Sequence, residues 1–147
     1  MVTDQATYDK ILELLDQNAD PQFIFDVTMQ NHSGYDTGLL PVDKQMHLNI
    51  DTTDLDAKTV EDGTLDEYVS CIEQSDQALR YFLNALSRLD RKVVVVFWGD
   101  HQPFFPSKFN DKWFTNEDDA THQERLWQTD YIIWANYDVA GCDQTSE

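Results

Sequence analysis

The stretch that decides the fold is Lys92–His101, which reads KVVVVFWGDH. Four consecutive valines followed by two aromatic residues are typical of a strand that is buried on both faces of a parallel sheet. Gly99 ends the apolar run, and the polar residues Asp100 and His101 come directly after it. The sequence therefore predicts an α/β fold whose sheet contains this strand.

Helical and strand patterns alternate along the rest of the chain. Apolar residues recur every three or four positions over Thr7–Gln17 and Leu65–Leu89, which predicts two helices. Runs rich in β-branched and aromatic residues predict two further buried strands, Phe23–Met29 and Asp130–Ala135. Residues 33–63 are predicted to form a loop. Ordered domains normally keep a loop of this length only for a functional reason. Strands joined by a crossover helix favour a mainly parallel sheet flanked by helices.

Length and charge narrow the classes of protein. The chain has 147 residues, and its 10 basic and 28 acidic side chains give a formal charge of −18. This length suits one domain, and 41% hydrophobic residues are enough for a packed core. The negative charge disfavours binding to nucleic acid or to an anionic membrane surface. No apolar run approaches the roughly 20 residues that span a bilayer, and the N-terminus lacks the features of a signal peptide.

The predicted sheet is thin for the strand that it contains. A strand buried on both faces needs neighbours on each side and layers above and below, and three strands do not supply them. The sequence therefore predicts a partial domain, the fragment of a larger α/β fold.

Two of the predicted strands end next to a histidine. Asn31 and His32 follow the first strand, and Asp100 and His101 follow the valine strand. Carboxyl ends of parallel strands meet at one edge of a sheet, so both pairs are expected at the same edge, where α/β proteins bind ligands. One Asp oxygen and one imidazole nitrogen can hold zinc, manganese or a similar ion. The alternatives are a turn in which Asp100 caps a backbone amide, and a His32 that only hydrogen-bonds locally.

Other polar and aromatic residues have simpler interpretations. Asp76 interrupts the apolar stripe of the long helix and is interpreted as a helix-face carboxylate with a hydrogen-bond partner. His47 and His122 fall in polar loops, with no partner that the sequence reveals. A loop over residues 102–121 carries aromatic side chains that pack the loop or line a pocket: Phe104, Phe105, Phe109, Trp113 and Phe114.

Several catalytic motifs do not occur in the sequence. It has no glycine-rich phosphate loop and no Gly-x-Ser-x-Gly elbow, and no serine or cysteine lies in a recognisable nucleophile motif. Cys71 and Cys142 have no metal-binding spacing and indicate nothing about the compartment. The sequence therefore identifies no nucleophile.

Four segments in this order resemble a known family. They are TMQNHSGY at Thr28–Tyr35, the helix over Tyr68–Leu83, VFWGDH at Val96–His101 and TDYIIWA at Thr129–Ala135. Together they resemble the C-terminal part of the sulfatase-like catalytic domain of lipoteichoic acid synthases and related phosphoglycerol transferases, in the alkaline phosphatase superfamily. The resemblance extends from about Phe23 to Val139. The ordered Asn-His and Gly-Asp-His motifs are its most specific part.

The resemblance implies a metal-dependent enzyme that uses manganese, magnesium or zinc. In this family a threonine attacks the phosphodiester of a phosphatidylglycerol-like lipid, and glycerophosphate passes to a polyglycerolphosphate acceptor of the cell wall. By matching position, Asp100 and His101 would be metal ligands, and Asn31 and His32 would bind substrate. His32 would also be catalytic, by bonding a phosphate oxygen or protonating the leaving alkoxide. The family implies an extracellular location, tethered to the membrane by an upstream segment.

The sequence departs from the family pattern upstream. The upstream half of the family's domain, which carries the nucleophilic threonine and a further metal-binding acid, is absent from these residues. Thr28 does not replace that nucleophile, because it belongs to the Asn-His motif. Gln102 and Pro103 after the Asp-His pair leave the donor and the acceptor open. Residues 1–147 are thus expected to be a C-terminal portion of a sulfatase-like domain, with a long loop at 33–63 and a polar tail at 141–147, inactive alone. Alternatives are a sulfatase or phosphoethanolamine transferase fragment, or a noncatalytic acidic interaction domain.

Overall fold

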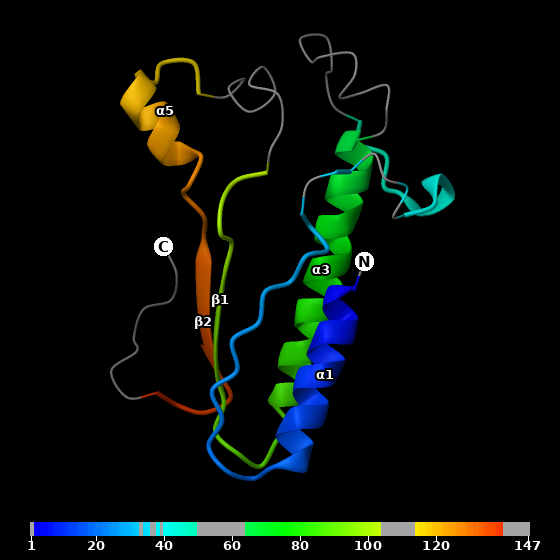
Figure 1. The fold of residues 1–147 in the computed structure, drawn as a ribbon, viewed down its shortest axis with the longest axis vertical. Coiled ribbons are helices and arrows are strands. Elements are labelled where there is room, and N and C mark those ends of the chain that lie inside the picture. The colour runs from blue at the N-terminus through cyan, green and yellow to red at the C-terminus, as the bar shows by residue number, and fades with distance from the viewer. Residues whose placement is uncertain are drawn as a thin grey trace.

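The computed structural model describes residues 2–32, 34, 35, 38, 40–49, 64–103 and 114–139. The elements in these residues are α1 (Asp4–Gln17), the short 3-10 helix η1 (Val42–Lys44), α3 (Thr64–Leu86), β1 (Val94–Trp98), α5 (Asp119–Arg125) and β2 (Tyr131–Ala135). The long helices α1 and α3 lie side by side, and the β1–β2 pair lies next to them (Figure 1).

The two long helices confirm the helices that the apolar periodicity predicts. Thr3 caps α1, because its hydroxyl oxygen accepts a hydrogen bond from the Ala6 backbone N–H at 3.2 Å. The helices meet where the Tyr8 ring stacks on the Phe82 ring, with centroids 4.6 Å apart. The buried residues around this contact form the main core: Tyr8, Ala78, Phe82 and Leu86.

The strands β1 and β2 are antiparallel, with Val95 opposite Trp134 and Val96 opposite Ile133. Because side chains alternate along a strand, Val95 and Trp134 share one face, and both pack against the helical core. Val96 and Ile133 share the other face, where they are 51% and 65% exposed. The helices of the described residues therefore cover one face of this sheet, and the burial of the valine strand on both faces is not found in these residues.

The mainly parallel sheet that the sequence predicts is not confirmed, since the described sheet has two antiparallel strands. The described part of the connection between the strands is consistent with this direction. The seven residues of α5 span about 10 Å, less than the roughly 16 Å length of the five-residue β1. Helix α5 stays at the end of the sheet where β1 finishes, so β2 starts there and runs back (Figure 1).

The predicted strand at Phe23–Met29 is extended but forms no sheet ladder with the described residues. It runs in the same direction as β1, and α3 joins the two in the opposite direction, as in a βαβ unit (Figure 1). Phe25 lies 6.2 Å from Trp98 between ring centroids. The segment thus lies alongside β1 without the backbone hydrogen bonds that would make it a strand.

The long loop and the tail are described only in part. Tyr35 and Leu65 form a second small core at the start of α3, and η1 interrupts the predicted loop. Residues 50–63 and the tail 141–147, including Cys142, lie outside the described residues. Among the described helices, none is both long and apolar enough to cross a bilayer.

Candidate functional site

The polar residues that follow segment 23–29 and β1 come after the corresponding ends of these two segments (Figure 1). Both segments run upward in Figure 1, so the Asn31–His32 turn and the Asp100–His101 turn come after their upper ends. This arrangement agrees with the expectation that both pairs reach one edge, although the neighbouring backbones form no ladder. A shared site for the two pairs stays a prediction.

Asp100 and His101 contact each other directly after β1. Asp100 Oδ1 accepts a hydrogen bond from the His101 backbone N–H at 3.0 Å, and Asp100 Oδ2 lies 3.3 Å from His101 Nε2. The other ring nitrogen, Nδ1, lies 2.7 Å from the backbone carbonyl oxygen of Gln102. A carbonyl oxygen can only accept, so Nδ1 carries a proton in this contact. The lone pair of the neutral ring is then on Nε2, the nitrogen that lies 3.3 Å from Asp100 Oδ2.

This geometry fits a bound cation between His101 and Asp100. An imidazole nitrogen and a carboxylate oxygen at this separation can bind the same metal ion. Histidines that bind metal commonly donate their second ring N–H to a carbonyl, as His101 does to Gln102. The 3.3 Å separation is also close to the ~3.4 Å between neighbouring ligands of a tetrahedral ion bound at about 2.1 Å.

Two side chains are too few for a complete metal centre. Within the ranges that the structure describes, no group of three or more His, Cys, Asp or Glu residues is placed to hold an ion. Structural sites need four protein ligands and catalytic ones about three. Asp100 also caps the His101 amide through Oδ1, so the turn interpretation and the ligand interpretation of this residue are compatible.

The Asn31–His32 turn is anchored to α3 through Asn31. Its side-chain Nδ2 donates to the Ser75 hydroxyl at 2.9 Å, and its backbone carbonyl accepts from the Tyr35 hydroxyl at 2.8 Å. The His32 backbone N–H donates to the Met29 carbonyl at 3.2 Å, which closes the turn, and the His32 side chain is exposed. Asn31 therefore holds His32 in place, and the predicted substrate contacts of both residues stay predictions.

The buried residue Asp4 is connected to the same turn by hydrogen bonds through Ser75 and Gln30. The Ser75 hydroxyl donates to Oδ2 of Asp4 at 2.5 Å, and the Asp4 backbone N–H donates to Gln30 Oε1 at 2.9 Å. Gln30 Nε2 in turn donates to the Cys71 carbonyl at 3.3 Å. Burial raises the pKa of the Cys71 thiol, and the carboxylates of Glu67 and Asp4 raise it further. Cys71 is therefore a neutral structural thiol rather than a nucleophile.

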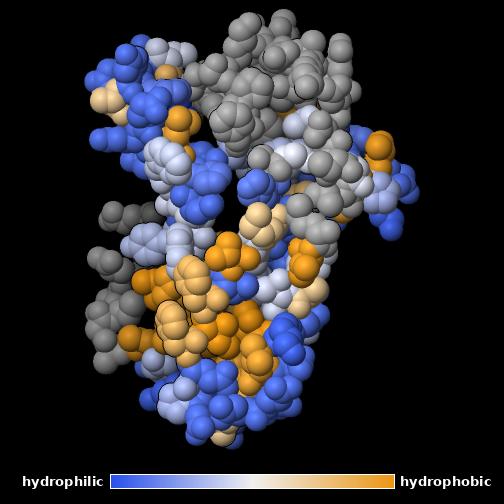
Figure 2. Space-filling model, in the orientation of Figure 1, coloured by the Kyte–Doolittle hydropathy of each residue, from blue (hydrophilic) through white to orange (hydrophobic). Residues whose placement is uncertain are grey.

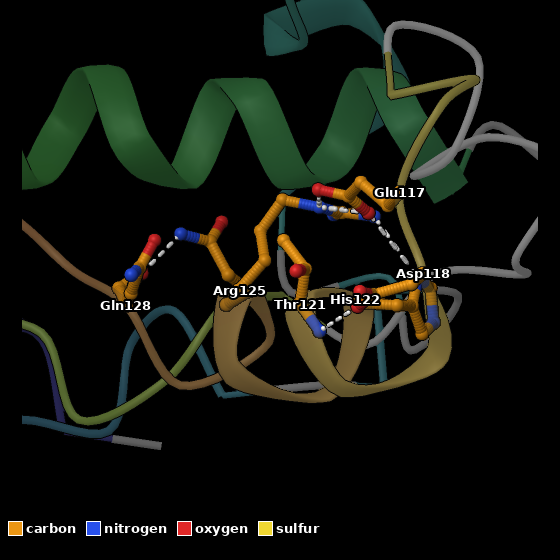
Figure 3. Close-up of polar contacts among 7 residues, drawn as sticks. Glu117, Asp118, Thr121, His122, Arg125 and Gln128 are labelled. Carbon is orange, nitrogen blue, oxygen red and sulfur yellow. Dashed lines mark hydrogen bonds and ion pairs between the residues drawn. The ribbon is translucent and has the colours of Figure 1, made fainter.

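A second polar cluster lies on and before α5 (Figure 3). Arg125 Nε donates to both carboxylate oxygens of Glu117, at 2.7 and 3.0 Å, and the guanidinium lies 4.0 Å from the centroid of the Phe114 ring. His122 Nδ1 lies 3.2 Å from Arg125 Nη2 and 3.5 Å from Glu117 Oε2. The hydrogen bond from Arg125 lowers the pKa of Glu117. His122 thus belongs to a helix and an ion-pair cluster, and its placement in a loop is wrong.

Sequence reasoning missed α5, although a local signal was present. Asp118 is an N-cap residue whose carboxylate accepts a hydrogen bond from the Thr121 backbone N–H at 2.8 Å. The expected loop over residues 102–121 therefore ends in a helix. Of its aromatic residues, only Phe114 lies among the described residues; those outside are Phe104, Phe105, Phe109 and Trp113.

The remaining candidates form exposed ion pairs. His47 Nδ1 lies 2.9 Å from Asp66 Oδ2, and Arg80 donates to Asp76 at 3.2 Å along the exposed side of α3. Asp76 therefore has the hydrogen-bond partner that its structural interpretation requires. Neither pair contacts the turn at Asp100 and His101 in the interactions that the structure records.

Comparison with known proteins connects these features to one family. The family model described as Sulfatase matches residues 1–147. The structure is similar to the Streptococcus pyogenes phosphoglycerol transferase GacH in complex with sn-glycerol-1-phosphate, with a TM-score of 0.62 and 30% identity. That match covers 91% of this chain and 31% of the GacH chain.

Two Rhizobium meliloti (strain 1021) proteins are also similar in sequence. The capsular polysaccharide biosynthesis protein RkpI is 47% identical over 49 residues, 31% of this chain and 9% of RkpI. A protein assigned to cyclic beta-1,2-glucan modification is 22% identical over 140 residues, 91% of this chain and 21% of that protein. The chain thus spans a third or less of the length of these relatives. The whole-chain family match and the similarity to GacH confirm the resemblance, and the chain belongs to the sulfatase family within the alkaline phosphatase superfamily.

Proposed function

We propose that this chain forms the Asp-His metal-binding part of a divalent-metal-dependent phosphoglycerol transferase that acts on a phosphodiester of a membrane lipid. The observation that carries this proposal is the contact at the end of β1. Asp100 Oδ2 and the lone-pair nitrogen of His101 lie 3.3 Å apart, and a backbone carbonyl engages the second ring nitrogen. The similarity to a phosphoglycerol transferase with bound sn-glycerol-1-phosphate supports the substrate class.

In this proposal, the described residues have separate roles. Asp100 and His101 hold manganese, magnesium or zinc, which when bound stabilises negative charge on phosphoryl oxygens and activates the nucleophile. His32 contacts a phosphate oxygen or protonates the leaving alkoxide, because imidazole can exchange protons near neutral pH. Asn31 fixes the His32 turn to α3 through Ser75 and contributes to substrate binding.

The missing catalytic groups are proposed to come from outside these 147 residues. The described residues supply two ligands, whereas a catalytic metal needs at least three. The relatives are three or more times longer than the matched region, which leaves ample chain for a further acid and a nucleophilic threonine. We therefore expect weak metal binding and no turnover from this chain alone.

We further propose that the acceptor is a carbohydrate hydroxyl rather than polyglycerolphosphate. The names of the two Rhizobium meliloti relatives, which concern a capsular polysaccharide and a cyclic glucan, support a glycan acceptor. A lipid donor and a secreted glycan acceptor would meet on the extracellular face of the membrane. This location is part of the proposal and rests on the family resemblance.

Mn²⁺ titration of the ¹⁵N-labelled chain tests the metal site directly. Bound Mn²⁺ broadens nearby nuclear magnetic resonance signals, so even weak binding is detected at its position. We expect the signals of Asp100 and His101 to broaden first, and Asp100→Ala and His101→Ala each to abolish this effect. Because the chain carries a charge of −18, the titration is run in 0.15 M salt, which screens nonspecific attraction of the cation to the surface.

The chain contains its own matched control. His47 and Asp66 form another exposed His-Asp pair, with 2.9 Å between Nδ1 and Oδ2, but in that pair the ring uses Nδ1 toward the acid. His47→Ala is expected to leave the broadening at His101 unchanged. Equal broadening at both pairs, or none at His101, would contradict the proposed metal site and favour a noncatalytic acidic domain.

A further inference from the structure

Gln102 connects the Asp100–His101 turn to the residues that lead from α5 into β2, at the same end of the sheet. Its backbone N–H donates to the Leu126 carbonyl at 2.9 Å, and its side-chain Nε2 donates to the Gln128 backbone carbonyl. Its own carbonyl accepts the hydrogen bond from His101 Nδ1 at 2.7 Å. All three of these polar groups of Gln102 are thus used, two to fix the residue and one to orient the ring of His101.

The segment to which Gln102 is fastened is itself held in place. The backbone N–H groups of Trp127 and Gln128 donate to carbonyls of α5 at 3.1 Å each, so residues 127 and 128 continue the last turn of that helix. Arg125 in the same turn is clamped by Glu117 (Figure 3). The acceptors of Gln102 therefore belong to a segment that is held by hydrogen bonds of its own.

Two more contacts bring this segment against the turn. The Trp127 ring meets the His101 ring edge-on, with centroids 5.9 Å apart and planes at 77°. The Thr129 hydroxyl donates to the Gly99 carbonyl at 2.6 Å, and a Cβ on Gly99 would lie only 3.2 Å from the Thr129 methyl carbon. The glycine of the Gly-Asp-His motif permits this close approach, so both sides of the turn rest on residues 126–129.

We propose that Gln102 is a positioning residue for His101, which keeps the ring proton on Nδ1 and leaves the lone pair on Nε2. Without the side-chain bond to Gln128, Gln102 is held by its backbone N–H alone, and its carbonyl is less firmly fixed against Nδ1. The ring then loses the contact that selects its tautomer and its orientation. This inference rests on the proposed function for its purpose, but the tautomer itself is a property of the chain without metal.

The test compares tautomers of His101 in the chain free of metal. Long-range ¹H–¹⁵N spectra distinguish a protonated Nδ1 from a protonated Nε2 in each histidine. We expect Nδ1–H as the major form of His101 in the unmodified chain. Gln102→Met, which keeps the length of the side chain but donates no hydrogen bond, should shift the population toward Nε2–H. Gln128→Ala is the matched control, because it retains the backbone carbonyl that accepts from Gln102.

The same variants are then titrated with Mn²⁺. Loss of an outer partner of a ligating histidine typically weakens metal binding 10- to 100-fold, and Gln102→Met is expected to cost about tenfold. Gln102→Asn, which retains the amide on a shorter side chain, should recover part of both effects. Amide spectra show whether a variant is folded. If Gln102→Met does not fold, the Gln102→Asn variant decides the outcome.

The two proposals fail in different ways. A His101 tautomer that is the same in the unmodified chain, in Gln102→Met and in Gln102→Asn overturns the positioning role, whatever the metal does. A tautomer that shifts as expected in a chain that shows no Mn²⁺ effect at His101 overturns the metal site and leaves the role of Gln102 intact.

Discussion

Burial of two tyrosine hydroxyls makes the stability of this chain sensitive to alkaline pH. Burial, with help from Asp4 and Asp26, raises the pKa of Tyr8 to about 12. Burial, with help from Tyr68 and Cys71, raises the pKa of Tyr35 to about 12 as well. The unfolded chain ionises near the ordinary value of about 10. Stability from these groups is therefore complete below pH 10 and is lost as the pH rises toward 12.

Urea denaturation followed by tryptophan fluorescence between pH 8 and 11.5 measures this effect. We expect the midpoint to fall steeply above pH 10, and Tyr35→Phe to flatten the fall although it lowers stability at pH 8. That initial loss is expected because the Tyr35 hydroxyl donates to the Asn31 carbonyl. Tyr131→Phe, at an exposed position of β2, is the control and should leave the slope unchanged. Identical slopes in the Tyr35→Phe variant and the unmodified chain would contradict the assignment.

At the scale of elements, α5 depends on one ion pair. The helix has only seven residues, too few to be stable by itself, and the Glu117–Arg125 contact closes it against the preceding turn. Glu117→Gln removes the negative charge that pairs with Arg125, and we expect α5 amides to exchange with solvent at least several-fold faster. The edge-on contact of Trp127 with His101 should weaken with it, which is visible as a change in the His101 ring chemical shifts.

Glu124 on the same helix provides the control, because its side chain is exposed and Glu124→Gln leaves the Glu117–Arg125 contact intact. A pH titration adds an independent check. Since Arg125 lowers the pKa of Glu117, the clamp is complete above the ordinary glutamate pKa and is lost as the pH falls through the lowered value. Unchanged exchange of α5 amides in Glu117→Gln would show that another contact holds the helix.

The elements also show what the sequence could predict and what it could not. Helices α1 and α3 were predictable because their apolar periodicity is local, and the Asp100–His101 contact was predictable because its partners are adjacent in sequence. The direction of β2 was not predictable, because it depends on the length and the position of α5 in the connection from β1. The partners of Gln102, Leu126 and Gln128, are more than 20 residues away, so no local pattern reveals them.

At the scale of the whole molecule, the two faces of the sheet differ in how far their apolar side chains are covered. Val95 and Trp134 pack on the helices, whereas the opposite face exposes apolar side chains: Val94, Val96, Trp98, Tyr131 and Ile133. Phe25 adjoins this face through Trp98, and Phe23 is 91% exposed. Figure 2 shows apolar side chains gathered over the lower half of the view, where segment 23–29 and the sheet lie. Apolar area of this extent normally belongs to an interface.

The occupant that fits the proposed function is the rest of a sulfatase domain, because the chain covers only 31% of the GacH chain. Substitutions on this face should then act differently in different contexts. Ile133→Thr is expected to change the stability of the 147-residue chain by less than about 1 kcal/mol, because the side chain is already 65% exposed there. In a longer parent protein that buries the face, the same change should cost about 1–3 kcal/mol. Trp134→Phe, on the inner face, is the control and should destabilise both proteins alike. An equally small cost of Ile133→Thr in the longer protein, measured by urea denaturation, would show that this face is not where the rest of the domain packs.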